Sequence, residues 1–130
     1  MTELMGETNS VKTAAEAAAI SLGLKTEQAQ LALELTMRNL KLFDKKQQDY
    51  GSGNISNNPM PEFGVALRAN DKVQRIMNLL SKGADSQCEA REDSWLDLAN
   101  YGLIGYMVAK GLWDSDKEVS RFIAATTEND

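Results

Sequence analysis

The chain has 130 residues, a net charge of −5, no histidine and a single cysteine, Cys88. These values exclude histidine-based catalysis and an intramolecular disulfide, and they argue against a general nucleic-acid binder, which normally carries a basic surface. The single cysteine predicts a reducing compartment, the cytoplasm. No apolar run approaches the roughly 18 residues of a membrane span, so the protein is predicted to need no membrane.

The whole chain is predicted to be helical. Between its breaks it is rich in Ala, Leu, Met, Lys, Gln and Glu, which favour helices, and no stretch alternates with the period of two expected for a strand. The length fits one domain. We therefore expect an all-α fold, a compact bundle of four to five helices in a single domain over residues 1–130, with its motif-bearing core at about 26–110.

The first two helices have recognisable ends. The first is predicted over residues 11–22, with Ser10 as its N-cap and Gly23 as its stop. The second is predicted over residues 26–50, with Thr26 as its N-cap. Its apolar stripe is formed by Leu33, Met37 and Leu40.

The end of the second helix carries the first candidate functional group. Lys45 and Lys46 are expected there, since the helix dipole favours cations near a C-terminus. Asp49 is not, because the same dipole disfavours a carboxylate. This misfit marks Asp49 and the adjacent Tyr50 as candidates for a functional role, with simple packing as the alternative for Tyr50.

Residues 51–62 are predicted to form a loop, because they contain both prolines and three of the turn-forming asparagines. A loop of this length in a compact domain is often functional, and a plain connector is the alternative.

The third helix, predicted over residues 63–80, carries a basic face. Its buried stripe is expected to be Val65, Ala69, Val73, Ile76, Leu79 and Leu80. Arg68, Asp71, Lys72 and Arg75 follow one another at helical spacing and therefore share one face. They form either a solvated face with weak ion pairs or a phosphate clamp, in which Arg gives bidentate hydrogen bonds and Lys a point charge.

The fourth helix, predicted over residues 91–109, carries an acidic face. Its apolar side is expected to contain Trp95, Leu98, Ala99, Leu103, Tyr106 and Met107. Asp93 and Asp97 are four residues apart, so their charges repel unless a cation lies between them. Hard oxygen ligands suit Mg²⁺, and Asn100 and Tyr101 follow one turn later. A short fifth helix is predicted over residues 115–125.

The basic and acidic helices are joined by a short connection, so we expect them to pack antiparallel. Their charged faces would then meet, together with Asp49 and Tyr50, in a pocket for a phosphorylated ligand such as a nucleotide.

Three motifs in these segments resemble a known family. The motifs are, in chain order, Lys-Lys-x-x-Asp-Tyr-Gly, Arg-x-x-Asp-Lys-x-x-Arg-x-x-Asn-Leu and Glu-Asp-x-x-x-Asp-Leu-Ala-Asn-Tyr. Together they are similar to the nucleotide modification associated domain 1 family of bacteriophages and bacteria. The resemblance covers residues 40–107, and it implies a role around deoxynucleotides in phage DNA metabolism or base modification, in the host cytoplasm.

The resemblance implies a set of site residues. Nucleotide contacts are expected from Lys46, Tyr50, Arg68, Lys72, Arg75, Asn78, Asn100 and Tyr101. Asp49 and Asp71 are the candidate catalytic carboxylates, and Asp93 and Asp97 are the candidate Mg²⁺ ligands.

The arrangement is also similar, more distantly, to all-α nucleoside triphosphate pyrophosphohydrolases of the MazG and dimeric dUTPase kind. Those use Glu-x-x-Glu and Glu-x-x-Asp helices to hold Mg²⁺. This chain departs from that pattern, because its acidic pair is Asp-x-x-x-Asp and no clean Glu-x-x-Glu precedes it.

Three functions follow as alternatives. The first is a Mg²⁺-dependent hydrolase of a nucleotide phosphate ester or pyrophosphate. The second is a non-catalytic module that binds or sequesters a nucleotide, such as a signalling nucleotide of host defence. The third is a helical protein-interaction domain. The alanine-rich first helix and an exposed Trp113 also leave room for a homo-oligomer.

Overall fold

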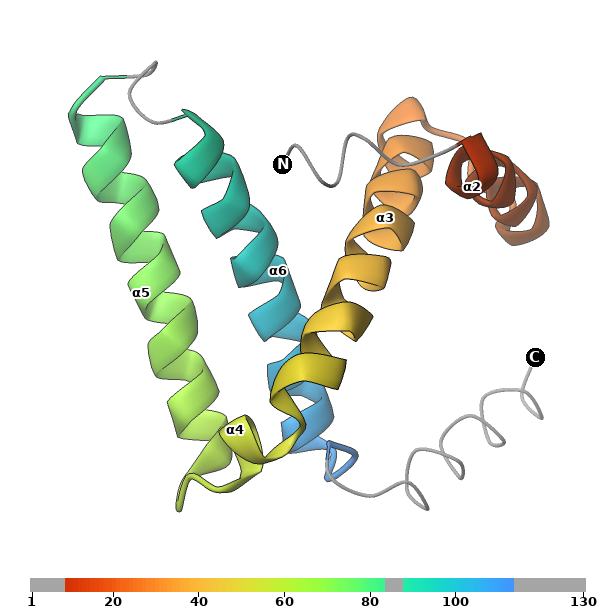
Figure 1. The fold of residues 1–130 in the computed structure, drawn as a ribbon. Helices are drawn as coiled ribbons and strands as arrows, with labels where there is room; N and C mark the ends of the chain where they lie inside the picture. Colours follow the sequence, from red (N-terminus) through yellow and green to blue (C-terminus); the bar gives the residue numbers. More distant parts are fainter. Residues whose placement is uncertain (1–8, 84–87, 114–130) are drawn as a thin grey trace. The chain divides into compact units, whose positions relative to one another are not determined.

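The predicted all-α class is confirmed. The computed structural model describes residues 9–83 and 88–113, which form helices and connections without a strand (Figure 1). The helices are α2 (Asn9–Leu22), α3 (Glu27–Tyr50), α4 (Gly53–Ser56), α5 (Pro61–Ser81) and α6 (Cys88–Ala109). Within these described ranges, none of the helices combines the length and apolar character needed to cross a membrane. The helix predicted over residues 115–125 lies outside the described residues.

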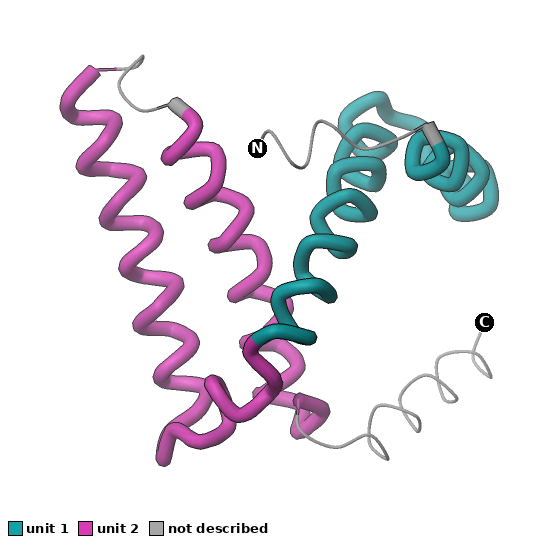
Figure 2. Tube along the Cα trace, in the orientation of Figure 1, with its two compact units in different colours: residues 1–49 teal, residues 50–130 magenta. Residues whose placement is uncertain are grey.

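The chain divides into two compact units, residues 1–49 and residues 50–130 (Figure 2). The predicted motif-bearing core of about 26–110 extends over both: Lys46 and Asp49 belong to the first unit, whereas the basic and acidic segments belong to the second.

Helix ends in the first unit follow local capping chemistry. The hydroxyl of Thr26 accepts a hydrogen bond from the backbone N–H of Ala29 at 3.1 Å, so the predicted N-cap of α3 is confirmed. Gly23 adopts a φ of 69°, a left-handed conformation that glycine reaches without strain, and α2 stops just before it. The helix begins at Asn9, so Ser10 lies inside its first turn and is not the N-cap.

The buried residues of α2 lie along one face of the helix. Val11, Ala15 and Ala19 are buried there at a spacing of four residues. On α3 the predicted stripe holds only in part, because Leu33 and Met37 are half-buried while Leu40 is exposed. A polar residue, Asn39, is the one that α3 buries.

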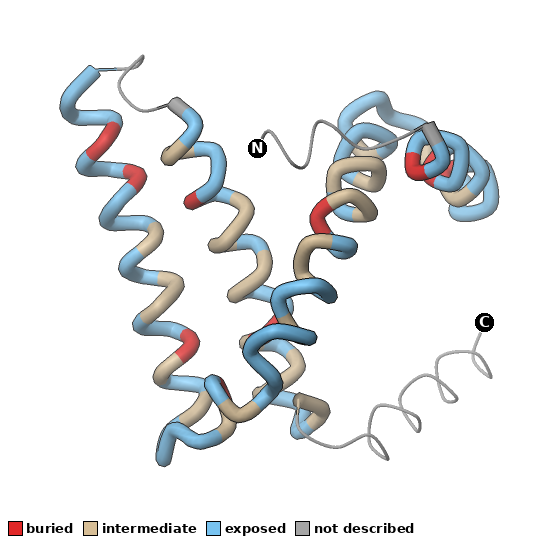
Figure 3. The backbone as a smooth tube through the Cα atoms, in the orientation of Figure 1, coloured by how far each residue is buried: buried red, intermediate tan, exposed pale blue. Residues whose placement is uncertain are grey.

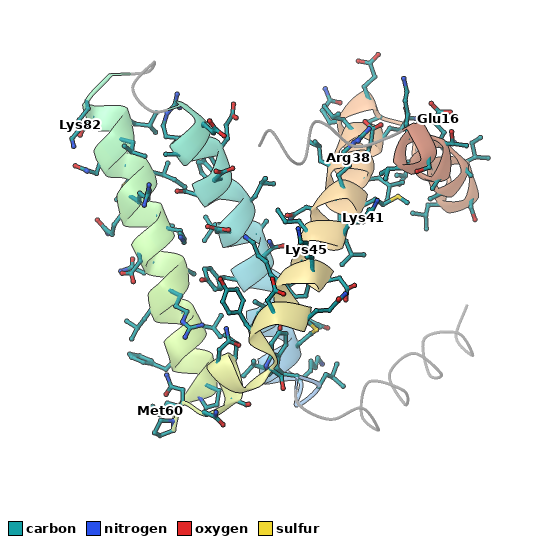
Figure 4. The ribbon with its side chains drawn as sticks, viewed as in Figure 1. Glu16, Arg38, Lys41, Lys45, Met60 and Lys82 are labelled. Carbon is teal, nitrogen blue, oxygen red and sulfur yellow. The ribbon has the colours of Figure 1, made fainter. Side chains whose placement is uncertain are left out.

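The second unit is built on an antiparallel hairpin of α5 and α6, as predicted (Figure 1). Pro61 opens α5 in the first turn, where its missing N–H costs nothing, and Met60 and Lys82 flank the helix at its two ends (Figure 4). Val65, Ile76 and Leu79 are buried along α5, and Ile104 is buried on α6 (Figure 3).

Two predicted stripes need correction. Val73 and Leu80 on α5 are exposed. The predicted apolar side of α6 is mostly exposed as well, because that helix buries Ser94 and Ile104, and Trp95, Leu103 and Tyr106 lie outside this contact. Ser94 fits the helix pair because its hydroxyl donates to the carbonyl of Ala90 at 2.8 Å, which satisfies its polar group.

The predicted loop over residues 51–62 contains a helical turn, α4, which packs on α5. Ile55 is buried in this turn. The indole N–H of Trp113 donates to the carbonyl of Ser52 at 3.0 Å. Trp113 is therefore half-buried against this turn, and the prediction of an exposed Trp113 is wrong.

Candidate functional site

The basic face of α5 lines a hollow of about 640 Å³ together with one residue of α6. We call it the basic hollow. Its lining residues are Arg68, Asp71, Lys72, Gln74, Arg75, Asn78 and Tyr101. With the exception of Gln74, every one of these was predicted from the sequence as a site residue.

The side chains of α5 converge because they are spaced along a single helix face. Arg68, Lys72 and Arg75 recur at intervals of four and three residues, which brings them to the same side of the helix. Tyr101 approaches this face from α6 and is half-buried. Three cations and one carboxylate, Asp71, give the basic hollow a local positive charge in a chain whose net charge is −5.

A second hollow of about 520 Å³ adjoins the first, and we call it the acidic hollow. Its lining residues are Lys72, Arg75, Glu89, Ala90, Asp93, Ser94 and Asp97. Lys72 and Arg75 line both hollows, and we call the two neighbouring hollows together the groove between α5 and α6. The groove is polarised, with cations at one end and carboxylates of α6 at the other.

An ion pair crosses the groove where the two hollows meet. The Nζ atom of Lys72 lies 3.1 Å from Oδ2 of Asp97, and both side chains are about one-third exposed or less, at 28% and 31%. A pair this accessible to water contributes less than about 1 kcal/mol to folding. The ammonium of Lys72 therefore offsets the negative charge of Asp97, one of the two aspartates that are predicted to repel each other on α6.

Arg68, which lines the basic hollow, is held by a hydrogen bond to α4. Its Nη2 donates to the carbonyl of Asn54 in α4 at 3.1 Å. A guanidinium has five N–H donors, so this hydrogen bond orients the side chain without using all of them. It also ties the 51–62 segment to the site, although α4 does not line either hollow.

Other predicted site residues lie elsewhere. Lys46 and Asp49 are in the first unit, and their predicted approach to the basic face stays a prediction. Tyr50 is exposed at the end of α3, and Asn100 is half-buried on α6; neither lines the basic or the acidic hollow.

Asp93 and Asp97, the predicted metal ligands, both line the acidic hollow. In residues 9–83 and 88–113, however, no three acidic or cysteine side chains are grouped closely enough to form a metal-ion site. Asp97 already pairs with the ammonium of Lys72 through one of its two carboxylate oxygens, Oδ2.

Sequence reasoning missed two features of the groove. Gln74 faces the basic hollow beside Arg75, and a neutral amide on a solvated helix gives no signal of its own. The pairing of Lys72 with Asp97 depends on the register between α5 and α6, which the spacing within each helix does not reveal.

No protein-family model, curated protein or solved structure matches the chain. The motif resemblance therefore stays a hypothesis.

Proposed function

We propose that this protein binds a phosphorylated small molecule, of the nucleotide class, in the groove between α5 and α6. The observation that carries the proposal is the basic hollow, in which Arg68, Lys72 and Arg75 converge beside the ring of Tyr101. Phosphate groups bind arginine through paired charge-assisted hydrogen bonds, and a base can stack on an aromatic ring.

The volume and the chemistry of the hollow support a ligand of this size. About 640 Å³ is within the range of small-molecule sites. Asn78 and Gln74 supply amides that can donate to or accept from the polar edge of a base or a sugar. Binding without catalysis would suffice for a protein that sequesters a nucleotide or presents it to a modification enzyme.

A metal-dependent hydrolase is the second candidate. The observation that favours it is the acidic hollow, where Glu89, Asp93 and Asp97 adjoin the cations that would hold the phosphates. Mg²⁺ commonly binds through one or two carboxylates together with substrate phosphates. Asp71, which lines the basic hollow, would be the carboxylate placed to act on a bound water.

The test is a thermal-shift screen of the purified protein with deoxynucleoside mono- and triphosphates and cyclic dinucleotides, in EDTA and in Mg²⁺. A ligand at 100 times its Kd adds about 2.7 kcal/mol, which raises the Tm by several degrees. A shift in EDTA supports the binding module, and a shift that needs Mg²⁺ supports the hydrolase. No shift with any of these compounds would refute both.

Arg75→Gln identifies the groove as the site. We expect it to raise the Kd of the best ligand at least about tenfold in calorimetry, since a hydrogen bond to a charged group is worth about 1.5–3 kcal/mol. Lys82→Gln is the matched control: it removes one positive charge at the C-terminal end of the same helix, outside the groove. Equal losses in both variants would mean that only net charge matters.

A further inference from the structure

The face of α6 that the hairpin leaves uncovered carries a regular row of residues. Its members recur at intervals of three and four residues, and we call the row the α6 seam. They are Glu92, Trp95, Ala99, Gly102, Tyr106 and Ala109, and all of them are exposed. Trp95 and Tyr106 are large apolar side chains with 55% and 58% of their surface in contact with solvent. Alternating intervals of three and four are the spacing by which one helix keeps a single face toward another.

The seam is symmetric about its own centre, between Asn100 and Tyr101. Two small residues, Ala99 and Gly102, lie next to the centre, and an aromatic residue stands four positions beyond each of them. A two-fold axis through this point would place Trp95 of one copy against Tyr106 of the other. Such self-complementarity is what an isologous interface between identical chains requires.

Space is available at the centre. A Cβ atom built on Gly102 meets nothing within 4 Å, whereas one built on Gly105 meets a methyl group of Val65 at 3.6 Å. Gly105 therefore lies at the contact between α5 and α6, whereas Gly102 faces open space within the described hairpin. Small central residues let two helix backbones approach closely, since the distance between helix axes depends on the side chains at the contact.

The charges at the ends of the seam are complementary in the same arrangement. Glu92 begins the row, and Lys110 follows its last residue, with Nζ 5.9 Å from the ring centroid of Tyr106. Antiparallel pairing about the centre brings Lys110 of one copy beside Glu92 of the other, twice per dimer. A parallel pairing would instead put like charges together, which is unfavourable.

We propose that the α6 seam is a homodimer interface, on which a second copy of this chain docks antiparallel. The aromatic pairs at Trp95 and Tyr106 supply most of the buried apolar surface, and aromatic residues are the usual energetic centres of interfaces. One pair of helices buries an area at the small end of specific interfaces, below about 1,200 Å², so we expect a weak dimer that depends on protein concentration. None of the seam residues lines the basic or the acidic hollow, so the inference does not rest on the proposed function.

Sedimentation velocity of the full chain from about 1 μM to about 1 mM is the first test, and a concentration-dependent dimer is expected. Ala99→Arg places a charged, long side chain at the centre of the seam and should raise the dimer Kd at least about tenfold. Ala66→Arg is the matched control, because it makes the same exchange at an exposed position of α5 and should leave the Kd unchanged.

Charge reversal provides a second, independent test. Lys110→Glu should weaken the dimer, and the double variant Glu92→Lys/Lys110→Glu should restore it, because the pair is reversed on both copies. Far-UV circular dichroism of each variant is the control that checks whether its helices are kept. A monomer at every concentration would overturn the proposal, as would a dimer that Ala99→Arg leaves intact or one in which the double variant fails to recover.

Discussion

At the scale of single residues, the glycines of the second unit have separable tasks. Gly64 lies in the first turn of α5, where the side chain of Asn58 covers it, and a Cβ there would be too close to the amide nitrogen of Asn58. That asparagine is not free to move at no cost, since its Oδ1 accepts a hydrogen bond from the N–H of Met60 at 2.9 Å. Gly105 has only an ordinary contact with Val65.

We predict opposite effects of alanine at these two glycines. Gly105→Ala should raise the free energy of unfolding by about 0.5–1 kcal/mol, the gain in helix propensity, because its new methyl group fits beside Val65. Gly64→Ala should gain less or become destabilising, because it displaces Asn58 and costs the turn a hydrogen bond. Urea denaturation of both variants checks this, and a larger gain for Gly64→Ala would contradict it.

At the scale of helices, the ends of α3 and α5 are set by residues that lie at those ends in the sequence. Thr26 caps α3, and Pro61 lies in the first turn of α5. Gly23, Gly51 and Gly83 all have positive φ just after a helix or its cap. The threonine cap and the glycines need only a few neighbouring residues, so the helix ends that they mark could be predicted closely. The start of α5 could not, because Pro61 and Glu62 fall inside the segment predicted as a loop.

The cap of α3 gives a direct test. Thr26→Ala should destabilise α3 by about 1 kcal/mol, because the N–H of Ala29 loses its acceptor. Thr36→Ala is the matched control: its hydroxyl only donates to the carbonyl of Ala32, at 2.6 Å inside the same helix, and alanine is the better helix former. Amide hydrogen exchange over residues 27–30 should accelerate in Thr26→Ala and not in Thr36→Ala. Unchanged exchange in both would contradict the cap.

Faces of helices were harder to predict than their ends. The basic face could be predicted because Arg68, Lys72 and Arg75 belong to one helix and their spacing alone brings them together. The apolar side of α6 could not, because Trp95 and Tyr106 are as apolar as buried residues and only the register against α5 shows that Ser94 and Ile104 face inward. The sequence of residues 51–62 predicts only a loop, because the helical turn α4, in which Ile55 is buried, is too short to give a periodic pattern.

At the scale of the whole molecule, the distribution of charge matters more than its sum. The net charge is −5, yet the basic hollow gathers three cations around one carboxylate. An acidic surface outside the groove disfavours a long polyanion such as DNA, whereas a small anion can enter the groove alone. The proposed ligand is therefore a nucleotide and not a nucleic acid.

The carboxylate of Asp97 is expected to have opposite effects on ligand binding in the two functions proposed for the groove. In the binding module this carboxylate, whose Oδ2 lies 3.1 Å from Nζ of Lys72, competes with a ligand phosphate for that ammonium and adds a negative charge beside the site. In the hydrolase it is a metal ligand. Removing its charge without changing its shape should thus act in opposite directions in the two cases.

The most direct measurement is calorimetric titration of Asp97→Asn and of the unaltered protein, in EDTA and again in Mg²⁺, with the nucleotide that gives the largest thermal shift. We predict that Asp97→Asn lowers the Kd about two- to fivefold, because an ion pair worth up to about 1 kcal/mol no longer competes for Lys72. Binding that requires Mg²⁺ and disappears in Asp97→Asn would contradict the metal-free binding site and support the hydrolase.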